Sequence, residues 1–127
     1  MGKNDDRLAQ IFAMRSAFLH AMKEKIPAAQ PELPIEISSK VGQQYCRDIA
    51  LRGVEEMFEA LQHLKNWKTH RLTDIPDFDR GEFLEEIVDA FNYFFALLIA
   101  VDCDEDEFFE AFLKKDKIIH DRLKNKY

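Results

Sequence analysis

Acidic residues at helical spacing are the side chains of this sequence best suited to chemistry. Glu82, Glu86 and Asp89 are spaced i, i+4 and i+7, so on an α-helix they share one stripe. Along the same helix that stripe continues to Tyr93 and Ala96, which are residue types of a protein core. Carboxylates in line with a buried seam repel one another and lose hydration unless cations neutralise them. The alternative interpretation is that this end of the helix leaves the core and is solvated.

A second acidic group precedes the first in the chain and consists of Glu55, Glu56 and Glu59. Glu56 and Glu59 lie within about 60° of each other around a helix. If the two segments form a helical hairpin, the two groups can face each other. Four or more carboxylates at one point favour a hard cation with oxygen ligands, so we expect Mg²⁺, or Mn²⁺ in its place, together with substrate phosphates.

Other catalytic patterns do not occur in the sequence. No Glu is followed three positions later by a His, the spacing of helical di-iron sites. The histidines His20, His63, His70 and His120 are scattered, and we interpret each as a surface or core side chain rather than a ligand. There is also no Walker loop, no GxGxxG and no GxSxG, so P-loop phosphate chemistry and serine acyl transfer have no support.

The C-terminal segment is basic, with six Lys or Arg and two Asp in residues 114–127. It has two interpretations. It is either a solvated helix end whose cations stabilise the helix dipole, or a phosphate clamp in which Lys115, Lys117 and Arg122 reach a metal-bound triphosphate. The single tryptophan, Trp67, stands beside Lys68. It either stacks on a nucleobase or packs at a helix end.

The elements that must position these residues are helices. The chain has 127 residues, of which 46% are hydrophobic, with four Gly and four Pro, so we expect one domain over residues 1–127 with few, long elements. Apolar residues at helical spacing predict helices at Asp5 to about Lys25, Ser39 to about Trp67, Arg80 to Val101, and from a cap at Asp102 or Asp104 to about Lys124. A break near Gly53 would raise the number of helices from four to five. The predicted fold class is therefore an all-α bundle of four to five helices.

The run from Ala90 to Val101 is 12 residues without a charge, and we expect it to be a core helix buried on most sides. It is shorter than the roughly 20 apolar residues that cross a bilayer. Because this run and the first helix both offer apolar faces, we also expect a homo-oligomer, most simply a dimer, that buries one of them between chains.

The net charge and the cysteine content restrict the classes of binding partner that we expect. A net charge of −6 disfavours nucleic acid polymers and anionic membrane surfaces, whereas a nucleotide remains possible because a metal ion bridges two anions. Cys46 and Cys103 form neither a disulfide framework nor a zinc signature. The N-terminus, MGKNDDRLAQ, lacks the apolar core of a signal peptide. We therefore expect a cytoplasmic protein with no membrane partner.

Glu55-Glu56-x-x-Glu59 followed by Glu85-Glu86-x-x-Asp89 resembles the EExxE and ExxD motifs of the all-α nucleoside triphosphate pyrophosphatases, a superfamily that includes the MazG proteins and the dimeric dUTPases. The segments LKNWK, EEIVDAFNYFFAL and FFEAFLKKDKIIHDR are similar to segments of the dimeric dUTPases. The resemblance covers about residues 40–125. It implies that fold and a metal-dependent hydrolase that converts a nucleoside triphosphate to the monophosphate and pyrophosphate.

The resemblance also implies roles for individual residues. The magnesium ligands would be Glu56, Glu59, Glu86 and Asp89. Glu55 or Glu82 would be an outer-shell carboxylate or the general base for water. Lys115 and Arg122 would bind phosphate.

The base-binding half departs from the dUTPase pattern. Both Asn residues of the closing pattern are replaced, by Asp116 and Ile119, and the position near Asn92 is often His in the dUTPases. Ser16 and His20 are the nearest counterparts of the first-helix Gln and Asn that hold the nucleoside. We expect a pyrimidine deoxynucleotide, dUTP or dCTP, as the substrate. Two alternatives stay open, a broad MazG-like pyrophosphatase and a non-catalytic helical interaction protein.

Overall fold

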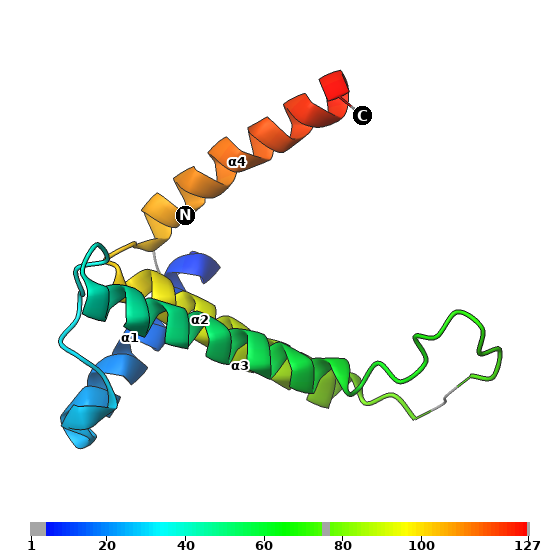
Figure 1. Ribbon diagram of the computed structural model, residues 1–127, viewed down its shortest axis with the longest axis horizontal. Helices are drawn as coiled ribbons and strands as arrows, with labels where there is room; N and C mark the ends of the chain where they lie inside the picture. Colours follow the sequence, from blue (N-terminus) through cyan, green and yellow to red (C-terminus); the bar gives the residue numbers. More distant parts are fainter. Residues whose placement is uncertain (1–4, 75–76, 127) are drawn as a thin grey trace. The chain divides into compact units, whose positions relative to one another are not determined.

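The computed structural model describes residues 5–74 and 77–126, and within these ranges the regular structure is entirely helical, which confirms the all-α prediction. In chain order the elements are α1 (Arg7–Lys25), the 3₁₀ turn η2 (Pro27–Ala29), α2 (Lys40–Leu61), α3 (Arg80–Ala100) and α4 (Glu105–Lys126) (Figure 1). None of the helices described is both long and apolar enough to cross a bilayer. The signal-peptide prediction begins on residues 1–4, which lie outside the described residues.

The chain divides into two compact units. Unit 1 comprises Met1–Ile35 and Leu98–Tyr127, and unit 2 comprises Glu36–Leu97. The α3 helix begins in unit 2, and its last residues belong to unit 1. That residues 1–127 act as one domain stays a prediction.

Unit 2 is a helical hairpin in which α2 and most of α3 lie side by side (Figure 1). Small residues allow this close approach, since Gly53 of α2 and Ala60 and Ala90 are all buried. A Cβ atom added to Gly53 would lie only 2.6 Å from the ring of Phe94 on α3. Gly53 therefore serves as the contact point of the hairpin, and α2 passes through it without the break that would have made a fifth helix.

The bounds of α2 differ from the prediction at one end only. Ser39 caps its start, with its hydroxyl accepting a hydrogen bond of 2.9 Å from the Gly42 N–H. The helix ends at Leu61, before the predicted end near Trp67. The reason is lack of burial, because Leu64 and Trp67 are both exposed and give a longer helix no apolar contact to stabilise it.

The burial of α3 also differs from the prediction. Its small residues are buried, but Phe91 is exposed and most of the other large side chains of its second half are half-buried. The expectation of a helix buried on most sides was wrong because, within the hairpin, α2 covers one side of α3 and leaves another side open.

Unit 1 is built around α1. The Asp6 side chain caps this helix by accepting a 3.1 Å hydrogen bond from the Ala9 N–H. Phe12 is buried, with its ring 6.2 Å from that of Phe108 on α4. The segment after α1 is held by side-chain bonds to carbonyl groups, among them Gln30 Nε2 donating to the Leu19 carbonyl at 3.1 Å.

The turn between α3 and α4 contains both aspartates that were predicted as possible N-caps of α4, and its geometry shows which of them has that role. Asp102 has a φ of 63° and ends α3 in a Schellman motif, in which the Cys103 N–H donates to the Leu98 carbonyl and the Asp102 N–H donates to the Ile99 carbonyl. Asp104 caps α4, and its Oδ1 accepts from the Glu107 N–H at 2.9 Å.

Candidate metal centre

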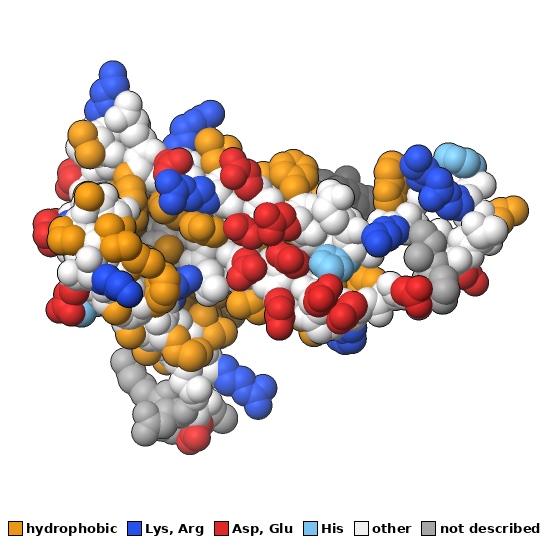
Figure 2. Space-filling view, turned by 90° about the horizontal axis from the view of Figure 1, so that it is seen from below, with side chains coloured by type: hydrophobic (Ala, Val, Ile, Leu, Met, Phe, Trp, Pro, Cys, Tyr) orange, Lys and Arg blue, Asp and Glu red, His pale blue; other side chains and the backbone are white. Residues whose placement is uncertain are grey.

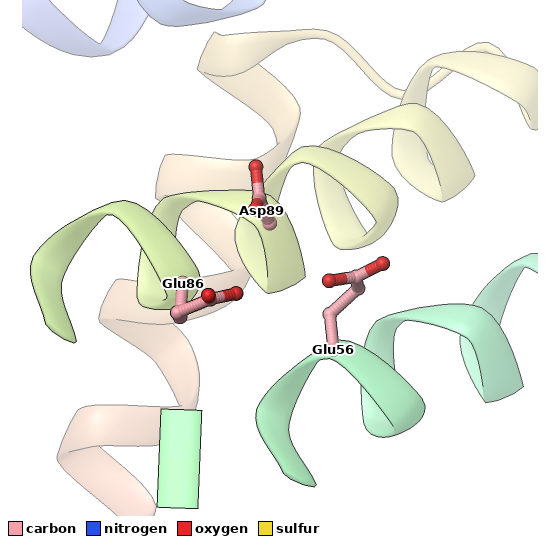
Figure 3. A group of neighbouring side chains, drawn as sticks. All are labelled: Glu56, Glu86 and Asp89. Carbon is pink, nitrogen blue, oxygen red and sulfur yellow. The ribbon is translucent and has the colours of Figure 1, made fainter. Parts of the chain in front are cut away.

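Three carboxylates of unit 2 converge between α2 and α3. Glu56 on α2 and Glu86 and Asp89 on α3 each offer an oxygen atom, and these atoms all lie within 4.8 Å of one another. The carboxylates of Glu86 on α3 and Glu56 on α2 are turned toward each other, with Asp89 nearby on α3 (Figure 3). Gly53 lies one helical turn before Glu56, so the close approach of α2 to Phe94 brings the Glu56 carboxylate within reach of α3.

Glu59 belongs to the same group. Its carboxyl lies close enough to Glu56 and Glu86 to raise the pKa of each. The four side chains proposed as magnesium ligands thus lie together, although they come from segments 30 residues apart in sequence. Acidic side chains gather on one face of the molecule, with a histidine beside them (Figure 2).

In this group, burial and the charges of neighbouring carboxylates both disfavour the ionised form of Glu56 and Glu86. The pKa of Glu56 is raised by partial burial first, and then by the negative charges of Glu59, Asp89 and Glu86. The pKa of Glu86 is raised by burial, by its hydrogen bond with Glu59, and by the charges of Glu59 and Asp89. Either a shared proton or a cation relieves this repulsion.

His63 is a neighbour of the group that the sequence interpretation missed. It follows α2 directly, and its positive charge opposes the rise in the pKa of Glu86. Its ring is half-buried and meets Phe83 edge-on, with ring centroids 6.4 Å apart. The sequence did contain a pattern that predicts this neighbour. His63 stands four residues after Glu59, and on a helix residues at this spacing lie on the same side.

The remaining predicted residues of unit 2 lie outside the three-carboxylate group. Glu55 and Glu82 are exposed, and Asn92 is half-buried on α3. Trp67 is 71% exposed in the segment after α2, so it is not a packed helix end. The ammonium of Lys68 lies 5.6 Å from its ring centroid, which is a cation–π contact.

The other predicted residues belong to unit 1, and the structure does not include them in the acidic group. Ser16 and His20 lie on α1, where they line a hollow of about 280 Å³ with Lys23 and Gln30. His20 also lies 3.1 Å from the Glu24 carboxylate. The predicted phosphate-binding residues Lys115, Lys117 and Arg122 are exposed on α4.

Comparisons with family models, curated proteins and solved structures found no match for this chain. The functional proposal therefore rests on the chemistry of the donor set. Glu56, Glu86 and Asp89 offer only oxygen atoms, from two half-buried side chains and one exposed one. Such a set suits Mg²⁺ or Mn²⁺, which take a few carboxylates and complete their coordination with water and phosphate.

Proposed function

We propose that this chain is a magnesium-dependent nucleoside triphosphate pyrophosphohydrolase that converts dUTP or dCTP to the monophosphate and pyrophosphate. One observation carries the proposal. The acidic residues of the two motifs come from different helices and meet at one point, where burial and the charges of neighbouring carboxylates raise the pKa values of Glu56 and Glu86. A solvated acidic surface does not require that convergence.

In this proposal Glu56, Glu59, Glu86 and Asp89 hold the metal. Magnesium, or manganese in its place, would neutralise charge on the triphosphate and on the leaving pyrophosphate. Glu55 or Glu82 orients a water molecule and accepts its proton as the water oxygen bonds to phosphorus. The α–β phosphoanhydride bond breaks, and its electron pair leaves with the departing phosphate oxygen.

The substrate contacts are assigned from side-chain chemistry. Lys115, Lys117 and Arg122 bind the phosphates, since ammonium and guanidinium groups donate charge-assisted hydrogen bonds to phosphate oxygens. Trp67 stacks on the base or lines its pocket, and Lys68, which contacts the Trp67 ring, binds substrate beside it. The Asn92 amide has both a donor and an acceptor and can pair with an edge of uracil or cytosine. Ser16 and His20 on α1 are assigned as contacts to the nucleoside.

The proposed enzyme is a cytoplasmic homodimer, and the exposed apolar face of unit 2 supports a second copy as its partner. Large exposed apolar side chains on the hairpin are Leu51, Val54, Phe58 and Leu61 on α2 and Leu84, Val88 and Phe91 on α3. Within each helix their spacing of three and four residues is that of a helix-packing seam. A monomer at micromolar concentration, measured by light scattering, would contradict the dimer.

A panel of nucleoside triphosphates tests the activity. Purified chain with millimolar Mg²⁺ is incubated with dUTP, dCTP, dTTP, dATP and the ribonucleotide UTP, and monophosphate and pyrophosphate are both quantified. We expect equal amounts of the two products, formed fastest from dUTP or dCTP and abolished by a chelator. Equal turnover of every nucleotide would favour a broad MazG-like enzyme. Failure with all of them would favour the non-catalytic interaction protein.

A further inference from the structure

His63 lies next to the carboxylate group in the hairpin of unit 2. Along the chain it stands four residues after Glu59, just beyond the end of α2. Its ring meets the ring of Phe83, with centroids 6.4 Å apart, and Phe83 stands about one turn before Glu86 on α3. Both helices of the hairpin therefore position His63, in the layer that follows Glu59 and Glu86.

The backbone and the ring of His63 are both held in place. Its N–H donates to the Ala60 carbonyl at 3.1 Å, and Ala60 is buried. Phe83 is packed in turn by Phe78, whose ring centroid lies 5.5 Å away. Among the residues described in unit 2, none forms a hydrogen bond or an ion pair with the His63 ring. The hairpin thus positions an imidazole N–H donor that it does not itself use.

Electrostatics connects this donor to the acidic group. Burial and Glu59 raise the pKa of Glu86, and the charge of a protonated His63 lowers it, so the ring is within electrostatic reach of that carboxylate. A magnesium ion held by a few carboxylates completes its coordination with water and phosphate oxygens. A triphosphate bound there also carries oxygen atoms that the metal does not contact, and nitrogen donors beside the metal stabilise them.

We propose that the imidazole of His63 donates a hydrogen bond to a phosphate oxygen of the metal-bound substrate. The inference rests on the proposed function, because the metal of that site brings the phosphate to His63. The neutral and the charged imidazole both carry an N–H, so the contact does not require His63 to change its protonation state. His63 and the carboxylates all belong to unit 2, whereas the phosphate-binding residues assigned on α4 belong to unit 1.

Binding of inorganic pyrophosphate to the full chain, measured by calorimetry with magnesium in excess, tests this contact without requiring turnover. His63→Phe keeps a ring against Phe83 and removes both nitrogen atoms, so the Kd of pyrophosphate should rise about 10-fold. His63→Gln loses the ring but keeps a nitrogen donor, and its Kd should stay within about threefold of the wild-type value. His70→Phe makes the same change at an exposed histidine in the segment after α2 and should leave the Kd unchanged.

A purely structural role of His63 predicts the opposite order of the two variants. If the ring only packs on Phe83, His63→Phe binds pyrophosphate like the wild type and His63→Gln binds it more weakly, and this result would overturn the proposal. A wild-type chain that binds no pyrophosphate would overturn it as well. Circular dichroism of each chain shows that it is folded.

Two further measurements separate this contact from the metal site and from catalysis. Magnesium alone, followed by thermal melts, should bind His63→Phe at least as tightly as the wild type. Weaker metal binding would show that His63 acts through the carboxylates, which also overturns the proposal. Pyrophosphate binding that depends on His63, in a chain that hydrolyses no nucleotide, would contradict the proposed function and support the phosphate contact. Nucleotide turnover with pyrophosphate binding that His63→Phe leaves unchanged would do the reverse.

Discussion

The hairpin of unit 2 and the α4 helix of unit 1 both carry stripes of charged residues at helical spacing. The two stripes differ in whether side chains of a second helix join them. In the hairpin, Gly53 meets Phe94 and brings a second helix against the acidic stripe, so carboxylates from two helices share one space. On α4 the cations Lys115, Lys117 and Arg122 all come from one helix and are exposed. Helical periodicity thus produces a stripe, and the approach of a neighbouring helix turns a stripe into a candidate site.

The largest expected effect lies in the hairpin. Glu86→Gln removes a charge and keeps the shape of the side chain, so the chain should fold while turnover of the preferred nucleotide falls by about 100-fold or more. Glu85→Gln is the matched control, because Glu85 is the exposed neighbour on the same helix and should leave turnover nearly unchanged. Pyrophosphate release measures both. Equal activity of the two variants would contradict the assignment of Glu86.

The packing contact that builds the site is tested by adding one methyl group. Gly53→Ala puts a Cβ into the Phe94 ring and should destabilise the fold by about 2 kcal/mol, as overpacking does. Gly81→Ala is its control, since the new Cβ would lie 3.4 Å from Asp79 Oδ1 and should be neutral or slightly stabilising. Urea denaturation measures both changes. If Gly81→Ala destabilises the fold as much as Gly53→Ala does, the close contact of Gly53 with Phe94 is not the cause of the destabilisation.

The α4 half of the comparison is tested by Lys115→Ala. If Lys115 binds substrate phosphate, its loss should raise KM by about 10-fold with little change in kcat, as expected for one charge-assisted hydrogen bond made equally in the ground and transition states. Lys114→Ala removes the adjacent cation as a control. Steady-state kinetics distinguishes the two variants. Unchanged KM for Lys115→Ala would leave α4 with its charge in an electrostatic or assembly role only.

The smallest effect is the response of stability to pH and metal. Because the pKa values of Glu56 and Glu86 are raised in the folded chain, the folded state binds more protons than the unfolded one above the ordinary Glu value of about 4.3. Their contribution to stability is present at lower pH and is lost as the pH rises through the raised values. Without divalent metal, this decline should be weaker in Glu86→Gln than in the wild type, as measured by thermal melts.

Magnesium should reverse that decline. At about five times its Kd it should stabilise the fold at pH 7 by about 1 kcal/mol, and the gain should shrink in Glu86→Gln. The control is the same concentration of sodium salt at matched ionic strength. A melting temperature that magnesium leaves unmoved would exclude a metal site between α2 and α3.

The sequence by itself determined the features that depend on neighbours along the chain. The bounds of α3, the two possible caps before α4 and the stripe of Glu86 and Asp89 all follow from backbone hydrogen bonding and a period of 3.6 residues. The choice of Glu56, Glu59, Glu86 and Asp89 as metal ligands came instead from the resemblance of the two acidic motifs, and it stays a proposal. Glycine at position 53 was ambiguous, because the same residue type weakens a lone helix and permits close packing of two.

Only the tertiary structure decided what lies between helices. It ends α2 at Leu61, leaves one side of α3 open, brings Glu59 close to both Glu56 and Glu86, and places the charge of His63 near Glu86. These outcomes depend on side chains that are far apart in sequence and on how closely two helix surfaces fit. A local pattern records which side of a helix a residue occupies, whereas the free energy of packing against the next helix determines which side is covered.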